Sequence, residues 1–161
     1  MGPDKTPMTT AVRALRQAGV AFTEHPYAYV ERGGTSTFAE ELGVDEHIVI
    51  KTLIMEDEAK RPLVVLMHGD REVSTKELAR TLGVKSVRPC APETAERHSG
   101  YMVGGTSPFG LRKPLPMIIE ESILELSRIY INGGKRGFLV GIDPKDLARI
   151  LKPIPVRVAI S

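Results

Sequence analysis

The chain has 161 residues, of which 42% are hydrophobic and 26% charged, and its formal net charge is +2. That length supports one hydrophobic core and one domain, and the near balance of charges excludes a strongly basic nucleic-acid binder while permitting contact with an anionic partner. Cys90 alone cannot form an internal disulfide, and no apolar run approaches the roughly 18 residues of a membrane span, so we expect a protein of the reducing cytoplasm. Residues 1–8 are expected to form a flexible leader and residues 9–161 the folded domain.

The N-terminal half of the domain is predicted to alternate short helices with strands. Capping residues followed by apolar residues at helical spacing and a terminal glycine indicate helices, and β-favouring runs indicate strands. A capping box, Thr37 with Glu40, starts the second helix. In chain order we expect a helix from Thr9 or Thr10 to Gly19, an edge strand within Val20–Tyr29, a helix ending at Gly43, a hairpin of His47–Glu56 with Leu63–His68, a helix from Ser74 to Gly83 and a strand over Val84–Arg88.

The C-terminal half continues in the same irregular way. In chain order we expect a helix over Pro92–His98, a strand that ends in the stretch Gly100–Gly110, a strand over Met117–Glu120, a turn or short helix over Glu121–Leu126, a strand over Arg128–Ile131, a glycine loop over Asn132–Gly137, a strand over Phe138–Ile142, a helix capped by Asp143 and a strand over Val156–Ile160. Strands and helices do not alternate regularly, and long crossovers are missing. The pattern therefore predicts an α+β domain with a curved or barrel-like sheet and helices outside it.

The glycine-rich stretch Gly100–Gly110 is the first candidate for a functional site. Gly104 and Gly105 permit positive φ angles and close approach of another backbone or a ligand, while Pro108 biases Ser107 towards an extended conformation. Such a loop can offer N–H groups to an anion or a carbonyl. Glycine pairs are common in plain turns, so the alternative that these glycines merely turn the chain stays open.

Lys51 is the second candidate, because it interrupts an apolar strand. Alternation places Lys51 opposite Ile50 and on one face with Val49 and Leu53. If that face is open, the ammonium group is solvated. If the face is covered, the charge needs a partner, and a substrate carboxyl, carbonyl or phosphate would serve.

Several familiar chemistries lack their sequence signature. Cys90 lies between Pro89 and Ala91 without the marks of an activated thiol, which favours a buried structural role. Ser107 is not part of a nucleophile elbow, and neither glycine loop matches a nucleotide fingerprint. No cofactor is therefore expected. Metal binding is not expected either, since the histidines lack paired ligand spacing and nearby cysteines: His25, His47, His68 and His98.

Taken together, several segments resemble the YbaK/EbsC family, which comprises freestanding relatives of the editing domain of bacterial prolyl-tRNA synthetase. The resemblance runs from about Thr9 to the end of the chain. It implies a mixed, largely antiparallel six- or seven-stranded barrel-like sheet surrounded by short helices. It also implies an aminoacyl-tRNA deacylase that acts on tRNA(Pro) mischarged with cysteine. Because the net charge is small, we expect free tRNA to bind weakly and specificity to come from a partner, for which prolyl-tRNA synthetase is the candidate. The segments that carry the resemblance are Tyr27, Val49–Leu53, Gly100–Gly110, Leu115–Pro116 and Gly133–Gly137.

The resemblance also implies roles for individual residues. Lys51 would hold the 3′-terminal phosphate or ribose region of the tRNA or stabilise developing charge. Thr52 would line the amino-acid pocket, where Lys-Thr is similar to the cysteine-editing branch, and Tyr27 would form its wall. Gly104 and Gly105 would present backbone groups to the ester. The other residues implied in substrate binding are Ser107, Pro108, Asn132, Gly133, Lys135 and Arg136.

The resemblance would explain the lack of a protein nucleophile. In the cysteine branch the thiol of the substrate attacks and expels the tRNA, so that the enzyme supplies orientation and electrostatics. Asn132 stands where relatives often carry serine and Leu139 where some carry aspartate, which leaves the edited amino acid open. Two alternatives remain: a deacylase for Ala-tRNA(Pro) or another small mischarged residue, and a non-catalytic module that binds tRNA or a synthetase through Lys135 and Arg136.

Overall fold

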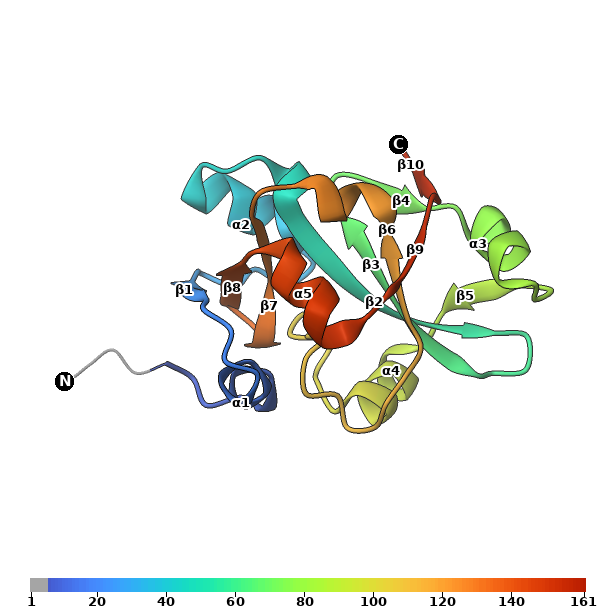
Figure 1. Ribbon diagram of the computed structural model, residues 1–161, viewed down its shortest axis with the longest axis horizontal. Helices are drawn as coiled ribbons and strands as arrows, with labels where there is room; N and C mark the ends of the chain where they lie inside the picture. Colours follow the sequence, from blue (N-terminus) through green and yellow to red (C-terminus); the bar gives the residue numbers. More distant parts are fainter. Residues whose placement is uncertain (1–5) are drawn as a thin grey trace.

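The fold is that of a mixed sheet flanked by short helices (Figure 1). The computed structural model describes residues 6–161, so most of the expected leader lies outside the described residues. The helices are α1 (Thr10–Gln17), α2 (Gly34–Leu42), α3 (Thr75–Leu82), α4 (Pro92–Ser99) and α5 (Pro144–Leu151), with 3-10 turns η1 (Glu46–Ile48) and η2 (Glu121–Glu125). None of these helices has the length and apolar character needed to cross a membrane.

Eight strands form the main sheet. They follow the order β1-β8-β7-β2-β3-β6-β9, and β5 pairs with β2 beside this path. The pairs β2–β7, β3–β6 and β6–β9 are parallel and the others are antiparallel, which confirms the predicted mixed α+β sheet. The strands are β1 (Thr23–Pro26), β2 (Val49–Asp57), β3 (Pro62–His68), β5 (Val87–Pro89), β6 (Met117–Glu120), β7 (Ile129–Lys135), β8 (Phe138–Ile142) and β9 (Ile154–Val156); β4 (Glu72–Val73) pairs with β10 (Ala159–Ile160) apart from them.

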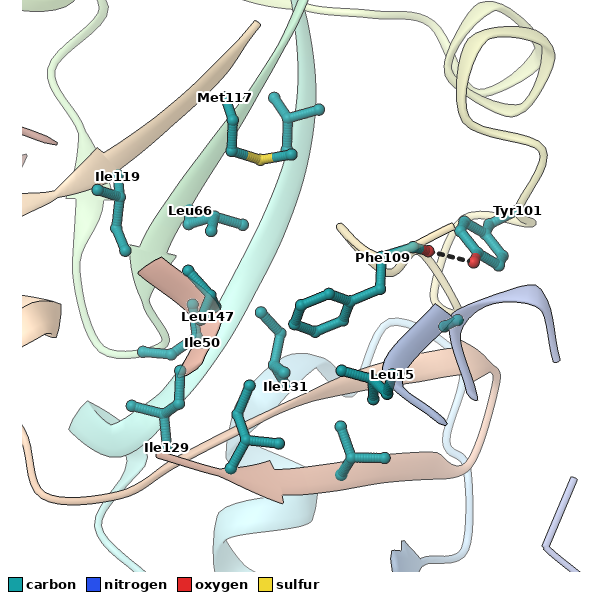
Figure 2. Close-up of a cluster of buried hydrophobic side chains, with 14 of the residues drawn as sticks. Leu15, Ile50, Leu66, Tyr101, Phe109, Met117, Ile119, Ile129, Ile131 and Leu147 are labelled. Atoms are coloured by element: carbon teal, nitrogen blue, oxygen red, sulfur yellow. Dashed lines mark hydrogen bonds between the residues drawn. The ribbon is translucent and has the colours of Figure 1, made fainter. Parts of the chain in front are cut away.

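One apolar core joins the two halves of the sheet (Figure 2). Ile131 of β7 and Leu66 of β3 are fully buried in the same cluster, together with Leu15 of α1 and Leu147 of α5. Strands that stand on either side of β2 can share one core only if the sheet bends around it. The bend gives the sheet the curvature predicted from the sequence, and α1 and α5 cover its inner face.

The helix caps confirm the local predictions. The hydroxyl of Thr9 accepts a hydrogen bond from the backbone of the first turn of α1, and Ser74 and Asp143 do the same for α3 and α5. Gly43 and Gly83 adopt the left-handed conformation where α2 and α3 end. Each side-chain cap stabilises its helix by about 1 kcal/mol, which is why these boundaries can be predicted from local sequence.

The start of α2 was predicted wrongly. The helix begins at Gly34 after a cap at Gly33 that makes no side-chain hydrogen bond, and Thr37 lies inside the helix. A Cβ at Gly33 would collide with the Thr37 hydroxyl, so the glycine lets the helix begin a turn early. Phe38 and Ala39 are thereby buried against the end of the sheet.

Two predictions around the glycine stretches were also wrong. No strand forms at Tyr101 in the described chain, because Gly100 ends α4 in the left-handed conformation and the Tyr101 hydroxyl donates a hydrogen bond to the Phe109 carbonyl 2.5 Å away. The expected glycine loop is mostly strand: β7 continues to Lys135, with a bulge between Asn132 and Lys135.

Candidate functional site

A cavity of about 650 Å³ opens where the main sheet splits. Strand β7 pairs with β2 only at Val49 and Ile50, and β5 pairs with β2 only from Met55 onward. Among the described strands none covers the edge of β2 between these two neighbours, apart from one hydrogen bond from the Cys90 N–H to the Ile54 carbonyl. The cavity therefore lies against an open strand edge, with α2, α4, the Gly104 loop and the β7–β8 turn around it.

Thr52 lies on the open part of β2 and lines the cavity. Its hydroxyl oxygen is buried, yet it has no hydrogen-bond partner among the described residues. An unpaired buried hydroxyl is costly, because the group has lost its water without gaining a replacement. A ligand in the cavity could supply the missing partner.

Lys51 also lines the cavity, and its ammonium group already has partners within the protein. Nζ donates a hydrogen bond to the Arg71 carbonyl at 2.5 Å and lies 3.5 Å from the Glu72 carboxylate. The partner that the charge needs is thus provided by the β3–β4 turn. An ammonium group has three N–H donors, so one remains for a ligand.

Of the two neighbouring glycines, Gly104 faces the cavity and Gly105 does not. The Gly105 N–H donates to the Met102 carbonyl at 2.8 Å, whereas no described residue accepts from the Gly104 N–H. Gly105 packs so closely on the β7–β8 turn that an added Cβ would lie 2.7 Å from the Arg136 nitrogen. Gly104 can therefore serve a ligand, and Gly105 permits the close packing that sets its position.

Asn132 connects the bulge of β7 to the Gly104 loop. Its side-chain oxygen accepts hydrogen bonds from the Gly134 and Lys135 N–H groups at 2.6 and 3.1 Å. Its side-chain nitrogen donates to the Gly104 carbonyl at 3.2 Å. A single amide thus fixes the position of two segments that both border the cavity.

The apolar wall of the cavity comes from the β1–α2 region and β8. The rings of Tyr27 and Phe38 meet edge to face, 5.3 Å apart, and Leu139 packs into the same cluster. All three side chains line the cavity. Burial raises the pKa of Tyr27, so its hydroxyl stays protonated near neutral pH.

Four predicted substrate-binding residues lie outside the cavity lining: Ser107, Pro108, Gly133 and Lys135. Ser107 is completely buried and its hydroxyl accepts a hydrogen bond from the Phe109 N–H, so it shapes the loop behind Gly104. Gly133 gives room to the Phe138 ring. Lys135 is exposed beside the cavity.

Cys90 was predicted to be buried, but it is only half-buried and lines the cavity. Burial and the neighbouring Glu56 carboxylate raise the pKa of its thiol to about 11. The thiol is therefore protonated at neutral pH and a poor nucleophile.

Sequence reasoning missed several cavity residues, chiefly Tyr29, Arg32, Glu96, Val103 and Thr106. For Tyr29 the alternation that places it on one face with Tyr27 was a signal, and Val103 and Thr106 belong to the glycine-rich stretch that was singled out as a whole. The others meet at the cavity through the tertiary fold.

The histidines lie elsewhere. His47 and His68 stack with ring centroids 3.7 Å apart, and His68 Nε2 lies 2.7 Å from the Ser122 hydroxyl. None of the residues that line the cavity is a histidine. Within residues 6–161 no group of three or more His, Cys, Asp or Glu side chains is placed to hold a metal ion.

The comparisons with known proteins place the chain in a family. The sequence model of the aminoacyl-tRNA editing domain matches residues 33–150. EbsC of Enterococcus faecalis, whose name gives it as a candidate Cys-tRNA(Pro)/Cys-tRNA(Cys) deacylase, is 31% identical over 140 residues, which cover 86% of this chain and 85% of EbsC. A proline–tRNA ligase of Nitratidesulfovibrio vulgaris strain Hildenborough is 32% identical over 140 residues, which are 85% of this chain and 22% of the ligase.

Solved structures show the same fold. The hypothetical protein APE2540 superposes with a TM-score of 0.86 at 22% identity, over 94% of this chain and 99% of the other. A candidate trans-editing enzyme for prolyl tRNA synthetase superposes with a TM-score of 0.81 at 22% identity, over 98% and 100% of the two chains. The chain therefore belongs to the aminoacyl-tRNA editing domain family, within its YbaK/EbsC branch.

Proposed function

We propose that this chain is a trans-editing deacylase that removes cysteine from mischarged tRNA(Pro) in the cytoplasm. The observation that carries the proposal is the cavity along the open edge of β2, where the Thr52 hydroxyl and the Gly104 N–H have no partner among the described residues. A cavity of about 650 Å³ has the volume for an aminoacyl group together with its nucleoside.

The buried hydroxyl of Thr52 supports cysteine as the edited residue. A cysteine thiol can donate to or accept from a hydroxyl, whereas the methyl group of alanine would leave the Thr52 oxygen unpaired. The similarity to EbsC, whose name specifies Cys-tRNA, supports the same direction.

In the proposed reaction the protein orients the ester and stabilises charge. The Gly104 N–H and the remaining Lys51 N–H are candidate donors to the carbonyl oxygen as it becomes negative. The substrate thiol attacks its own ester carbon and forms a carbon–sulfur bond, the carbon–oxygen bond to the tRNA breaks, and the proton lost by the thiol passes to the 3′-terminal ribose oxygen, so that cysteine leaves as a cyclic thioester. The protonated Cys90 thiol and the absence of histidines from the cavity lining support a mechanism without a protein nucleophile.

A panel of mischarged tRNAs tests the proposal. Wild-type protein should deacylate Cys-tRNA(Pro) faster than Ala-tRNA(Pro), and Lys51→Ala should lower that rate strongly. Lys76→Ala, a lysine exchange on α3 away from the cavity, is the matched control. Unchanged deacylation of Cys-tRNA(Pro) by Lys51→Ala would refute the role of Lys51. Binding without turnover of every aminoacyl-tRNA would instead favour a tRNA-binding module.

The participation of the thiol has a separate test. tRNA(Pro) charged with 2-aminobutyrate carries a side chain of nearly the same size without sulfur. If the thiol attacks, this substrate should react much more slowly than Cys-tRNA(Pro). Equal rates would show that water is the nucleophile, while the deacylase activity itself would stand.

We also propose that tRNA selection depends on a partner such as prolyl-tRNA synthetase. A net charge of +2 provides little general attraction to the phosphate backbone. Part of a proline–tRNA ligase is similar to this chain, which supports the synthetase as the source of tRNA(Pro). Adding the synthetase should increase the deacylation rate at limiting tRNA; tight, salt-insensitive binding of bare tRNA would contradict this dependence.

A further inference from the structure

The mouth of the cavity has a rim of exposed side chains around the half-buried Tyr29, which the aminoacyl pocket itself does not explain. We call Tyr29, Val30, Met102, Val103 and Arg136 the rim. They come from three segments: the β1–α2 connection, the Gly104 loop and the β7–β8 turn. Val30, Met102 and Val103 are 52%, 57% and 41% exposed. Exposed apolar side chains that gather beside a cavity indicate a binding surface.

The rim contains an aromatic ring and a planar cation in a fixed arrangement. The Arg136 guanidinium carbon lies 5.2 Å from the centre of the Tyr29 ring. Arg136 Nε also donates a hydrogen bond to the Val103 carbonyl at 2.9 Å, which holds the plane of the group. The residue is exposed, and no described carboxylate forms an ion pair with it.

These features match the way proteins bind unpaired nucleotides. Nucleobases stack on aromatic rings and on guanidinium planes, and exposed apolar side chains extend the platform. The uncompensated charge of Arg136 also attracts a phosphate group. A purely protein partner could use the apolar side chains, but it would not need a free guanidinium plane fixed on a ring.

Continuity with the cavity identifies which nucleotides these are. Four of the five rim residues, all except Met102, also line the cavity. If the terminal aminoacyl-adenosine occupies the cavity, the RNA chain has to leave through its mouth and pass over the rim. We propose that the rim stacks the single-stranded nucleotides immediately before the terminal adenosine of the charged tRNA. This inference rests on the proposed deacylase function.

The test compares two small substrates that differ only in those nucleotides. One is the cysteinyl ester of adenosine, and the other is the same ester on the trinucleotide CpCpA. Stacking of one base should raise kcat/KM for the trinucleotide by about tenfold or more over the adenosine ester in the wild-type protein. Tyr29→Ala and Arg136→Lys should bring that ratio close to one, and Tyr29→Phe, which keeps the ring, should preserve it.

The ratio separates stacking from a structural role. Tyr29 and Arg136 also contact the Gly104 loop, and damage to this loop would lower kcat/KM for both substrates by the same factor. The ratio of the two kcat/KM values would then stay as in the wild-type protein, and this result would overturn the inference. Lys76→Ala is the control for altered surface charge. If the wild-type protein deacylates neither substrate nor Cys-tRNA(Pro), the proposed function itself fails; if it deacylates both small substrates equally well, only the stacking inference fails.

A spectroscopic measurement gives an independent readout. A CpCpA analogue with 2-aminopurine in place of the middle base reports stacking through its fluorescence. Binding should change that fluorescence in the wild-type protein and in Tyr29→Phe, but not in Tyr29→Ala. If the fluorescence does not change with the wild-type protein at saturating oligonucleotide, the inference is overturned. It is also overturned if the rim variants lose binding to the synthetase while the oligonucleotide fluorescence changes with them as it does with the wild-type protein.

Discussion

Gly105→Ala tests how the position of the Gly104 loop controls activity. Gly105 does not have a positive φ, so alanine is compatible with its backbone conformation. The added methyl group would however lie 2.7 Å from the Arg136 nitrogen and 2.9 Å from the Lys135 carbonyl carbon. Both are backbone atoms that cannot rotate away, and ordinary contacts begin at 3.4 Å. The loop must therefore move by about 0.7 Å from the β7–β8 turn.

A shift of this size breaks the contacts that hold the loop. The hydrogen bond from Arg136 to the Val103 carbonyl would lengthen from 2.9 Å to about 3.6 Å, and the 3.2 Å bond from Asn132 to the Gly104 carbonyl would also exceed hydrogen-bond range. Two lost hydrogen bonds and the overpacking together should lower the free energy of unfolding by about 2–4 kcal/mol. Displacement of the Gly104 N–H from the ester should reduce kcat/KM by about 100-fold.

Urea denaturation and deacylation of Cys-tRNA(Pro) measure the two effects. Gly83→Ala is the matched control, because Gly83 has a φ of +73° and open space around its Cβ position. It should cost about 1 kcal/mol through backbone strain and leave kcat/KM unchanged. If Gly105→Ala retains wild-type stability and kcat/KM, the loop is not held by this packing and the reasoning is wrong.

The cavity thiol, the unpartnered hydroxyl and the buried imidazole each give a further prediction. Because the pKa of Cys90 is raised to about 11, its alkylation by iodoacetamide should be slow at neutral pH and should accelerate by about tenfold per pH unit in alkali. Since the thiol is not the nucleophile, the deacylation rate of Cys90→Ala should stay within about twofold of the wild-type rate. Thr52→Val should leave the urea midpoint unchanged or raise it, because it removes a buried hydroxyl without a partner. It should nevertheless slow deacylation of Cys-tRNA(Pro) more than deacylation of the 2-aminobutyrate substrate. An equal decrease in rate for the two substrates would argue against a contact between Thr52 and the thiol. Burial lowers the pKa of His68 below its unfolded value of 6.5, so the contribution of the neutral imidazole to stability is complete above pH 6.5 and is lost as the pH falls through the folded pKa. Urea unfolding at pH 7.5 and 5.5 should therefore show a smaller decrease in the free energy of unfolding for His68→Leu than for the wild-type protein.

Features set by neighbouring residues could be predicted from the sequence. The caps at Thr9, Ser74 and Asp143 and the left-handed glycines at Gly43 and Gly83 depend on contacts within a few residues. The start of α2 could not be predicted, because its Gly33 cap makes no side-chain hydrogen bond and because Phe38 packs in a cluster with Leu139, about a hundred residues later.

The candidate site was only partly predictable for the same reason. Tyr27, Lys51 and Thr52 were identified, and the structure brings them to one cavity. The cavity itself arises because β7 and β5 pair with different parts of one edge of β2, which depends on long-range pairing. Likewise, no local pattern indicates that Gly105 is a packing residue while Gly104 faces the cavity.

The two departures from the YbaK/EbsC pattern have different consequences. At Asn132 the side-chain oxygen accepts two backbone N–H groups, and one N–H of the amide is used by the Gly104 carbonyl. Because most of its hydrogen-bonding capacity is used within the protein, Asn132 acts mainly on loop position. Leu139 has no such partners and presents an apolar surface to the cavity beside Tyr27. An aspartate there would place a charge in that wall, whereas leucine disfavours polar substrate groups. We therefore expect an exchange at Leu139 to change the choice of amino acid more than an exchange at Asn132, which a panel of mischarged tRNAs would measure.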